Sequence, residues 1–594
     1  MGLLQKACET YDAMEHLAGV EITDRETLAP VSHITTRAQI EITLDADGRF
    51  RSARTVDKKE PKILIPATES SAGRTQAPCA HPLCEQLGYL APVHPEKYRL
   101  YVEQLADWDH SEYSHPKLQP ILRYVQSGTI LQDLARSEIL RLNPQGAPEN
   151  ENDEKLLVRW VVVGLGEDVS GPCWTDRKLM RCFIDYYASR PGALPESLCM
   201  ISGRISPPAA QHPKGISPIN GNAKLISAND GSGFTYRGRF DDPSQAATIG
   251  YLSSQKAHCA LRWLIANQGS IWGDRTFICW NPQGISLPPV TGSMRRRSKQ
   301  EPRAATPTEY RRQLSEALNV WKEDLPAQAG VVIAAFDAAT PGRLALTYYN
   351  ELQASDFLQR LHDWEESCCW ENASFGIQSP SLYHIVNWAF GVQRNQKPET
   401  DPRILRQQMQ RLISCRVDRM QFPLDIERAL VQKASQLLLY EETERKNLLF
   451  VACAGIRKYH IDHFKEEWNM ALDKENTNRS YLFGRLLAIA DTVERKTYEE
   501  NENRETNALR MQKAFALRPL SGWRILEEKL EPYYRRLKPG LRQYFRCLTQ
   551  EIADKLPASG EDLNRKLDDV YLLGYYHQKA YRPENTEIKE KEED

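Results

Sequence analysis

Residues 201–233 cannot form a continuous helix, because proline and glycine recur there every few positions. The interrupting residues are Pro213, Gly215, Pro218, Gly221, Gly231 and Gly233. Proline lacks the N–H group that a helix interior needs, and glycine permits positive backbone dihedrals, so main-chain N–H groups can turn toward an anion or a ligand. Lys214 and Lys224 add positive charge to the same stretch. We therefore expect an irregular loop suited to binding.

A helix and a buried strand are predicted directly after this loop. Residues 255–265 carry an apolar stripe at helical spacing, and residues 275–280 (RTFICW) form an apolar run before a proline-rich exit. The order of elements, with a turn at Ser202 and Gly203, the HPK loop, the LISAND strand end, the helix and the GDRTFICW strand, resembles one family. It is similar to the large subunit of the type I-C CRISPR-associated surveillance complex (Cascade). The amino-terminal block around residues 48–90 and the helical tail fit the same family.

The first half of the chain alternates strand-like and helical segments. Residues 38–44 (AQIEITL) alternate at period two, residues 45–48 supply turn chemistry, and residues 50–56 are expected to return as the second strand of a hairpin. Further strands are predicted from β-branched content and flanking turns. They lie at residues 62–65, 156–163, 331–336 and 344–348.

From about Pro402 onward, apolar residues recur at helical spacing. The stripes are Ile426, Leu430, Ala434 and Leu437; Leu482, Leu486, Ile489 and Val493; Leu541, Phe545, Leu548, Ile552 and Leu556; and Leu563, Leu567 and Val570. Ser480 and Ser559 are predicted N-caps. Short connections imply antiparallel neighbours. The predicted fold class is α+β, with a mixed α/β region over residues 1–395, a flexible basic loop near 284–307, and a helical bundle over 396–594.

Charge is balanced over the whole chain but uneven along it. Lysine and arginine number 77 against 79 acidic residues, so any nucleic-acid surface must be a local patch. Between Arg504 and Arg546 there are eleven basic and four acidic residues, interleaved with aromatic ones. A groove that binds single-stranded nucleic acid typically has cations placed along the phosphates and aromatic side chains that stack on the bases. For Tyr544 and Phe545, a place in the bundle core is the alternative.

Two groups of cations are predicted to bind the displaced strand or the nucleic-acid backbone. The first is Arg524, Arg535, Arg536, Lys538, Arg542 and Arg546, and the second is Arg403, Arg406 and Arg411, which belong to a basic face with Arg416 and Arg419.

No catalytic or cofactor signature stands in the sequence, since the P-loop, the zinc-protease motif, the nucleophile elbow and the dinucleotide fingerprint are all missing. Cys79, His81 and Cys84 lack a second ligand pair at zinc-like spacing and are interpreted as a helix start with a buried cysteine. An odd number of cysteines, thirteen, fits reduced thiols in a cytosol. Nothing approaches the length of apolar sequence that a membrane span needs. We expect a non-enzymatic cytoplasmic protein without metal or cofactor.

The alternative is an RNA-processing or DNA-cleaving enzyme of the same defence system. A metal-free RNA endonuclease needs only a general base and an electrostatic clamp, which His212 beside Lys214 could supply.

The resemblance implies a definite role. Large subunits of this kind read the protospacer-adjacent motif in duplex DNA, help to open the duplex, hold the displaced strand and recruit a helicase-nuclease. The implied partners are backbone subunits bound to CRISPR RNA, small helical subunits, the target duplex with its displaced strand, and the helicase-nuclease, with no membrane.

Motif reading needs polar side chains on an adaptable loop and cations that fix register on phosphates. The candidates are Ser70, Ser71, Arg74, Thr75, Gln76, Lys214, Asn220, Asn222, Lys224 and Asn229, with Gly231, Ser232 and Gly233 as the candidate duplex wedge. The family also implies small helical subunits made by internal translation. Met470 lies in a polar stretch before the stripe that begins at Leu482, so a product covering residues 470–594 is expected.

Overall fold

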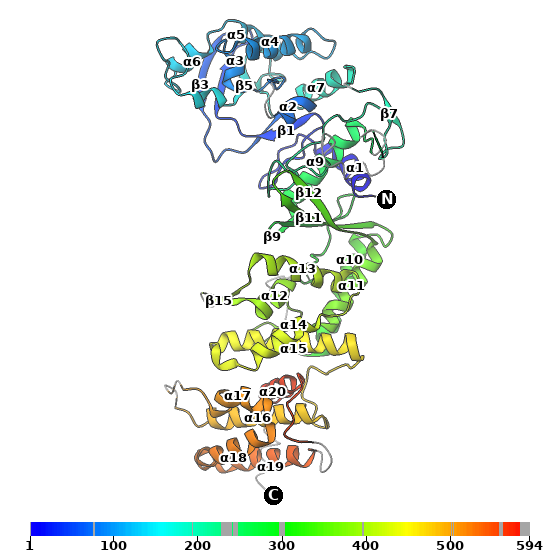
Figure 1. The fold of residues 1–594 in the computed structure, drawn as a ribbon, viewed down its shortest axis with the longest axis vertical. Coiled ribbons are helices and arrows are strands. Elements are labelled where there is room, and N and C mark those ends of the chain that lie inside the picture. The colour runs from blue at the N-terminus through cyan, green and yellow to red at the C-terminus, as the bar shows by residue number, and fades with distance from the viewer. Residues whose placement is uncertain are drawn as a thin grey trace. The chain divides into compact units, whose positions relative to one another are not determined.

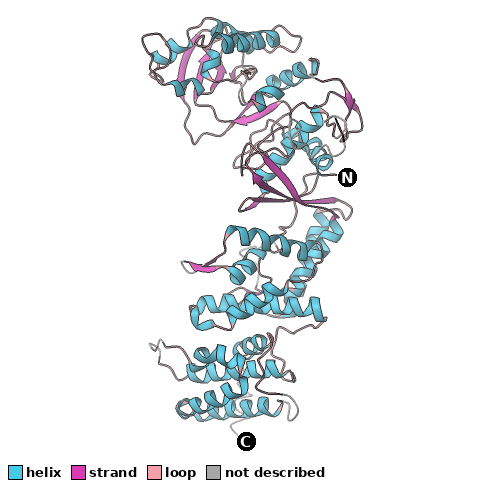
Figure 2. Ribbon diagram, in the orientation of Figure 1, coloured by secondary structure: helices cyan, strands magenta, loops and turns pink. Residues whose placement is uncertain are grey.

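The computed structural model describes residues 2–74, 78–192, 194–226, 240–241, 247–295, 303–372, 374–394, 397–499, 502, 504–556 and 562–581. These fall into two compact units. The first unit contains residues 1–286 and 330–351, and the second contains residues 287–329 and 352–594. Most strands lie in the first unit and helices dominate the second, which confirms the α+β fold class (Figure 2). The predicted division at residue 396 falls inside the second unit.

One core of the first unit is built on a four-stranded sheet of order β3-β2-β5-β6. Its strands are β2 (Ile40–Leu44), β3 (Phe50–Thr55), β5 (Val158–Val162) and β6 (Gly171–Pro172). The β2–β3 hairpin is antiparallel as predicted, and β5 lies parallel to β2. Alternate residues Ile40, Ile42 and Leu44 are buried because a strand points successive side chains to opposite faces.

Helices contribute buried apolar residues to the same core as this sheet. They are α3 (Leu87–Leu90), α4 (Pro95–Asp109), α5 (Leu118–Gln126), α6 (Ile130–Arg136) and α7 (Arg177–Ser189). Figure 1 shows α5 and α6 beside the strands of the sheet. Trp108 on α4 and Trp160 on β5 are fully buried at the centre of this core. Nearby, β1 (His33–Thr36) pairs antiparallel with β4 (Ile63–Pro66), and α2 (Glu69–Gly73) follows β4. The short 3₁₀ segment Glu151–Lys155 precedes β5.

The second core of the first unit contains the helix and strand predicted after the irregular loop. Its sheet has the order β12-β11-β10-β9, and α1 (Leu3–Met14) packs beside α9 (Tyr251–Gln268) against it. The strands are β9 (Ser270–Trp272), β10 (Arg275–Trp280), β11 (Gly330–Thr340) and β12 (Arg343–Gln353). The predicted pairing of residues 331–336 with 344–348 is confirmed. The small hairpin of β7 (Ser197–Leu198) and β8 (Ile205–Ser206) precedes α9.

Among the residues that the structure describes, the second unit is helical apart from two short hairpins. The hairpins are β13 (Trp370–Asn372) with β14 (Gly376–Gln378), and β15 (Val392–Arg394) with β16 (Lys397–Glu399). The helices are α10 (Pro307–Asp324), α11 (Ala354–Ser367), α12 (Leu382–Phe390), α13 (Pro402–Val417), α14 (Leu424–Ala434), α15 (Glu442–Phe464), α16 (Arg479–Arg495), α17 (Asn507–Leu517), α18 (Pro519–Arg536), α19 (Pro539–Asp554) and α20 (Tyr571–Ala580). None of the helices in the described ranges is both long and apolar enough to cross a membrane.

Most residues of the predicted apolar stripes are buried, while Leu541, Leu556 and Leu563 are half-buried. Leu482, Leu486 and Ile489 are each at most 1% exposed. The last predicted stripe is not helical, because residues 562–570 form turns and coil before α20.

The predicted cap of α16 is also wrong. Asn478, and not Ser480, caps the helix by accepting the N–H of Tyr481, at 3.1 Å. Ser480 lies inside α16, where its hydroxyl accepts the N–H of Asp568 at 3.0 Å. Ser559 lies outside the described residues.

Met470 lies in the segment that connects α15 to α16. The segment is held by Arg457 of α15, which is 2% exposed and donates to the carbonyl oxygens of Trp468, at 3.0 Å, and of Glu366, at 2.6 Å. The predicted start at Met470 therefore precedes α16 and divides no helix. Whether it is used stays a prediction.

Two glycines let α16 and α20 touch backbone to backbone. A Cβ atom on Gly484 would lie 1.9 Å from the carbonyl oxygen of Tyr571, and one on Gly574 would lie 2.1 Å from that of Tyr481. Real Cβ atoms do not approach backbone oxygens so closely, so any larger residue must push the helices apart. The crossing therefore requires glycine on both helices.

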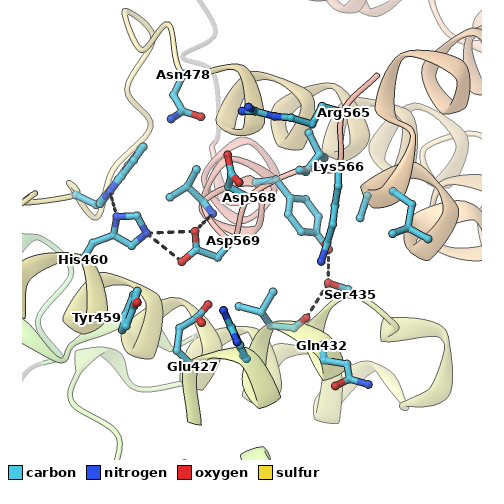
Figure 3. Close-up of a pocket in the computed structure, with 18 of the residues that line it drawn as sticks. Glu427, Gln432, Ser435, Tyr459, His460, Asn478, Arg565, Lys566, Asp568 and Asp569 are labelled. Carbon is cyan, nitrogen blue, oxygen red and sulfur yellow. Dashed lines mark hydrogen bonds and ion pairs between the residues drawn. The ribbon is translucent and has the colours of Figure 1, made fainter. Parts of the chain in front are cut away.

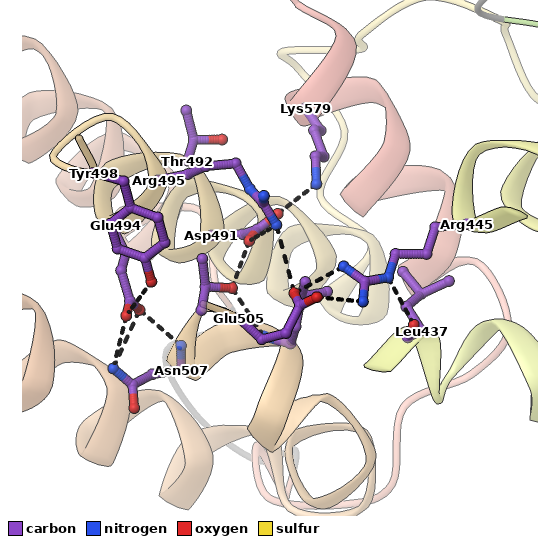
Figure 4. A network of polar contacts seen from close by, with 12 residues as sticks. Leu437, Arg445, Asp491, Thr492, Glu494, Arg495, Tyr498, Glu505, Asn507 and Lys579 are labelled. Carbon is purple, nitrogen blue, oxygen red and sulfur yellow. Dashed lines mark hydrogen bonds and ion pairs between the residues drawn. The ribbon is translucent and has the colours of Figure 1, made fainter. Parts of the chain in front are cut away.

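A network of charged groups joins α15, α16, α17 and α20 (Figure 4). The Asp491 carboxylate on α16 is fully buried, is paired with Lys579, and accepts the hydroxyls of Thr506 at 2.6 Å and Tyr575 at 3.0 Å. Arg445 of α15 makes a two-pronged ion pair with Glu505, at 2.6 and 2.8 Å. Burial alone would raise the pKa of Asp491, but the charge of Lys579 and the hydrogen bonds outweigh burial and lower it.

Replacing Gly574 by alanine is expected to destabilise the second unit by about 1–3 kcal/mol or more, because the added methyl group meets an immovable backbone oxygen. Urea unfolding monitored by circular dichroism measures the change. Gly221→Ala is the control, because a Cβ there meets nothing within 4 Å. An unchanged unfolding midpoint in Gly574→Ala would contradict the close crossing.

Asp491 should make the second unit sensitive to acid. Because its folded pKa is lowered, its contribution to stability is present above the ordinary aspartate pKa of about 3.9 and is lost as pH falls through the folded pKa. Asp491→Asn should cost about 1–3 kcal/mol at pH 7 and flatten the dependence of the urea midpoint on pH between about 3 and 5. Asp554→Asn, at an exposed position, is the control. Parallel pH curves for wild type and Asp491→Asn would exclude this role.

Candidate nucleic-acid interface

The two loops predicted to read a DNA motif lie against each other in the first unit. The backbone N–H of Gln211 donates to the carboxylate of Glu69 on α2, at 2.7 Å. A Cβ on Gly73 would lie 2.3 Å from the side-chain oxygen of Gln211. Burial raises the pKa of Glu69, which is consistent with a carboxylate enclosed between the loops. The structure thus brings together α2 and the loop that contains Lys214.

Within the first loop, Ser70 is exposed while Ser71 and Arg74 serve the fold. The Ser71 hydroxyl accepts the N–H of Thr68 and contacts Nδ1 of His81, both at 2.9 Å, and Ser71 is 2% exposed. The Arg74 guanidinium pairs with the buried Glu85, at 2.8 Å. Because these contacts occupy their polar groups, neither side chain is presented to a base edge as expected. Thr75 and Gln76 lie outside the described residues.

The second loop is shaped by glycine and by Arg262. Gly215 has φ of +70°, and a Cβ there would lie 2.8 Å from the carbonyl oxygen of Gly221. Arg262 of α9 donates to the carbonyl oxygens of Lys214, at 2.7 Å, and Gly215, at 3.2 Å. Asn220 and Asn222 are exposed at the turn. Asn220 also has a positive φ of 53° and donates to the carbonyl oxygen of Ala338, at 3.3 Å.

Two lysines face each other across this loop. Lys214 and Lys224 form an antiparallel backbone bridge and are both half-buried. Burial lowers the pKa of Lys224, and the nearby charge of Lys214 lowers it further. Two cations in this position favour a bound anion such as a phosphate, which would relieve their repulsion. Asn229 and the candidate wedge of Gly231, Ser232 and Gly233 lie outside the described residues.

His212, the candidate general base of the alternative enzyme, is directed into the interior. It is 7% exposed, its Nδ1 lies 2.8 Å from the Ser254 hydroxyl, and its ring stacks on that of His258, with centroids 6.0 Å apart. Burial, aided by the charge of Lys224, lowers the pKa of His212 to about 4. The ring is therefore neutral at pH 7 and is covered by protein.

Cys79, His81 and Cys84 do not converge as metal ligands. His81 is buried against Ser71, and Cys84 is 1% exposed. Within the ranges that the structure describes, no group of three or more His, Cys, Asp or Glu side chains could hold a metal ion. Cys84 is buried as predicted, but the helix begins later than expected, at Leu87.

Cations of α18 and α19 gather where the two helices join. Arg535 and Arg536 end α18, Lys538 is the N-cap of α19, and all three are exposed. Arg535 and Lys538 have no ion-pair partner among the described residues, and neither has Arg524, about three turns earlier on α18. Arg542, one turn into α19, is half-buried. The junction therefore carries positive charge that the described part of the chain does not neutralise.

Other predicted cations are already engaged within the fold. Arg546 pairs with Glu531, at 2.8 Å. Arg536 lies over the ring of Tyr533, at 5.9 Å from its centroid. Arg411 makes a two-pronged pair with Asp425, both contacts at 2.6 Å. Arg403 is exposed and Arg406 is half-buried, both on the first turns of α13.

Arg416 does not belong to the basic face predicted for it. Its side chain is 1% exposed and pairs with the equally buried Glu365, at 2.9 Å. Buried arginine is tolerated here because the Glu365 carboxylate and the Gly292 carbonyl oxygen, at 2.6 Å, accept from its two terminal nitrogens, although its Nε has no partner. The spacing of arginines along α13 did not reveal this burial, since Glu365 lies on another helix.

Most aromatic residues of the basic block belong to the core. Trp523, Tyr534, Tyr544 and Phe545 are each at most 8% exposed. Tyr533 is half-buried and lies under the guanidinium groups of Arg504, at 5.6 Å, and Arg536. The alternative interpretation of Tyr544 and Phe545 is therefore correct, and Tyr533 is the least buried of these five aromatic residues.

A polar cavity of about 1190 Å³ lies between α14, α15 and the segment before α20 (Figure 3). His460 is held between two carboxylates, with Nδ1 2.9 Å from Glu466 and Nε2 3.0 Å from Asp569. Burial raises the pKa of Glu427 to about 8, and the neighbouring Asp569 adds to this effect. Sequence reasoning noticed His460 but missed the cluster, because Glu427 and Asp569 are distant in the chain.

One comparison with known proteins finds a match. The family model described as CRISPR-associated protein (Cas_Csd1) matches residues 8–582. No curated protein matches the chain. The match extends over both compact units, including the paired loops of the first and the cationic junction of the second.

Proposed function

The chain belongs to the CRISPR-associated Cas_Csd1 family of type I-C, and on this premise we propose that it is the non-catalytic large subunit of the RNA-guided DNA surveillance complex. In this role it recognises the protospacer-adjacent motif in duplex DNA, promotes R-loop formation, holds the displaced strand and recruits the helicase-nuclease. Its protein partners are the backbone subunits on CRISPR RNA and small helical subunits.

The observation that carries this proposal is the unneutralised charge at the junction of α18 and α19. At this junction Arg535 and Lys538 are exposed and have no ion-pair partner in the described ranges, and the same holds for Arg524, about three turns earlier on α18. Exposed cations without a counter-charge in the fold favour the binding of an anion. A single strand supplies phosphates at regular intervals and a base for Tyr533, so the junction suits the displaced strand.

The paired loops of the first unit support the duplex-binding part of the proposal. Lys214 and Lys224 can bind a phosphate and so fix the position of the duplex relative to the loop. The exposed amides of Asn220 and Asn222 can then form hydrogen bonds with base edges. Phosphate-fixing cations beside exposed amides are the combination that motif reading requires.

Replacing Arg524, Arg535 and Lys538 together by glutamine should weaken binding of the assembled complex to DNA of any sequence. Each phosphate that the variant no longer neutralises should reduce the slope of log affinity against log salt by about 0.7–0.9, while motif preference survives. Filter binding over a series of salt concentrations measures both.

The matched control for this variant removes the same kind of charge where it is already neutralised. Arg411→Gln with Arg546→Gln deletes two arginines that pair with Asp425 and Glu531, so the salt slope should change much less. Equal slopes for wild type and the junction variant would refute the assignment of the displaced strand to this junction.

In the loops, replacing Asn220 and Asn222 by alanine should lower affinity for motif-bearing duplexes by about 1–3 kcal/mol for each base that a side chain reads. Affinity for scrambled duplexes should barely change. Lys214→Gln with Lys224→Gln should instead weaken both duplexes alike, because these residues bind phosphate. Competition binding with the two duplexes separates the effects, and a uniform loss in the asparagine variant would show that Asn220 and Asn222 do not read bases.

The alternative, an RNA-processing or DNA-cleaving enzyme, is distinguished by incubating the pure chain with repeat RNA and with target DNA. Cleavage that is abolished in His212→Ala but kept in His258→Ala would favour it.

A further inference from the structure

Exposed apolar side chains gather around the β7–β8 hairpin and the first turn of α9. Leu198, Met200, Ile205 and Leu252 are 55%, 56%, 64% and 52% exposed. All lie within the first unit, on two elements joined by the bridge between Pro208 and Gly250. A folded chain leaves large apolar residues exposed together mainly where another surface covers them. We call Leu198, Ile205 and Leu252 the apolar ridge.

Two cavities flank this ridge and share Ser206 and Leu252 in their walls. The larger has a volume of about 730 Å³, and the smaller about 490 Å³. One wall of the larger cavity is a stripe of α4 that includes Leu100, and another is a stripe of α7 that includes Tyr187. Pockets beside exposed apolar residues are typical of protein-binding surfaces, in which side chains of the partner insert into preformed pockets.

The rim of the larger cavity is acidic. Glu103 and Asp107 are exposed one turn apart on α4, and Glu69 also lines the cavity. Glu103 lies 3.8 Å from Arg99 of the same helix, in an exposed pair that neutralises it weakly. Asp107 has no cationic partner among the described residues. The cation of this rim, Arg190, donates to the Tyr186 hydroxyl, at 2.9 Å. Carboxylates here repel phosphate and attract lysine or arginine, so the charge favours a protein over a nucleic acid.

We propose that the apolar ridge and the larger cavity dock a backbone subunit of the complex, through a segment whose apolar side chains are flanked by lysine or arginine. The apolar side chains cover the ridge and enter the cavity, and the basic residues meet Glu103 and Asp107. The exposed apolar side chains favour a permanent subunit over a transiently bound protein, because obligate interfaces are more hydrophobic than transient ones. This inference rests on the proposed place of the chain in the complex but not on its contacts with DNA.

The test uses the full chain carrying Leu198→Ser, Ile205→Ser and Leu252→Ser, and the purified backbone assembly with its CRISPR RNA as the probe. Affinity measured by biolayer interferometry should fall at least tenfold. The matched control replaces three exposed apolar residues elsewhere in the same unit, Ile22→Ser, Val163→Ser and Ile271→Ser, which are 37%, 37% and 48% exposed, and should bind within twofold of wild type.

A charge-reversal variant tests the acidic rim separately. Glu103→Lys with Asp107→Lys should weaken binding at low salt, with the difference from wild type shrinking as salt rises. Circular dichroism and thermal melting confirm that each variant is folded, as expected for exposed positions.

Three results would overturn the proposal. The ridge variant could bind the backbone assembly within twofold of wild type, it could lose affinity only for the helicase-nuclease, or it could lose only self-association of the chain seen by sedimentation. Duplex DNA binding by each isolated variant is measured in parallel. If the ridge variant loses the backbone assembly while the wild type shows no DNA affinity, the proposed DNA-binding function fails and the docking surface stands.

Discussion

The direct backbone contact between α16 and α20 is the constraint on which the end of the second unit depends. Gly484 and Gly574 allow the helices to approach until each meets a carbonyl oxygen of the other. That approach places Asp491 of α16 beside Tyr575 and Lys579 of α20, so a buried carboxylate gains the partners it needs. Without the small residues, the same carboxylate would be left in the interior without them, which is far more costly than breaking a surface pair. Packing and electrostatics therefore specify one arrangement together.

Arginine has two opposite uses in the second unit. Arg416 and Arg457 are buried, where their planar groups satisfy carbonyl and carboxylate oxygens from other helices. Arg524 and Arg535 point outward and are unpaired in the described ranges. A count of charges along the sequence treats both kinds alike. The structure separates them by a simple criterion, the presence of an acceptor within hydrogen-bond distance.

Local patterns predicted local structure well and tertiary surroundings poorly. The hairpin at residues 38–56 and the strand at residues 275–280 follow from alternation and turn residues that lie next to each other in the chain. Ser71 and Arg74 looked like exposed loop residues because their partners, His81 and Glu85, are fixed only when the loop folds back. The cluster around His460 was hidden for the same reason, since its carboxylates come from three separate segments.

Lys214 and Lys224 have a consequence for how the first unit responds to its ligand. Partial burial and the repulsion from Lys214 lower the pKa of Lys224, although the Glu69 carboxylate offsets part of this effect. Any polyanion that binds between them removes this repulsion, and a ligand that binds only the folded form raises the stability of that form by mass action. If this loop binds DNA as proposed, bound DNA would therefore stabilise the conformation of the loop that binds it.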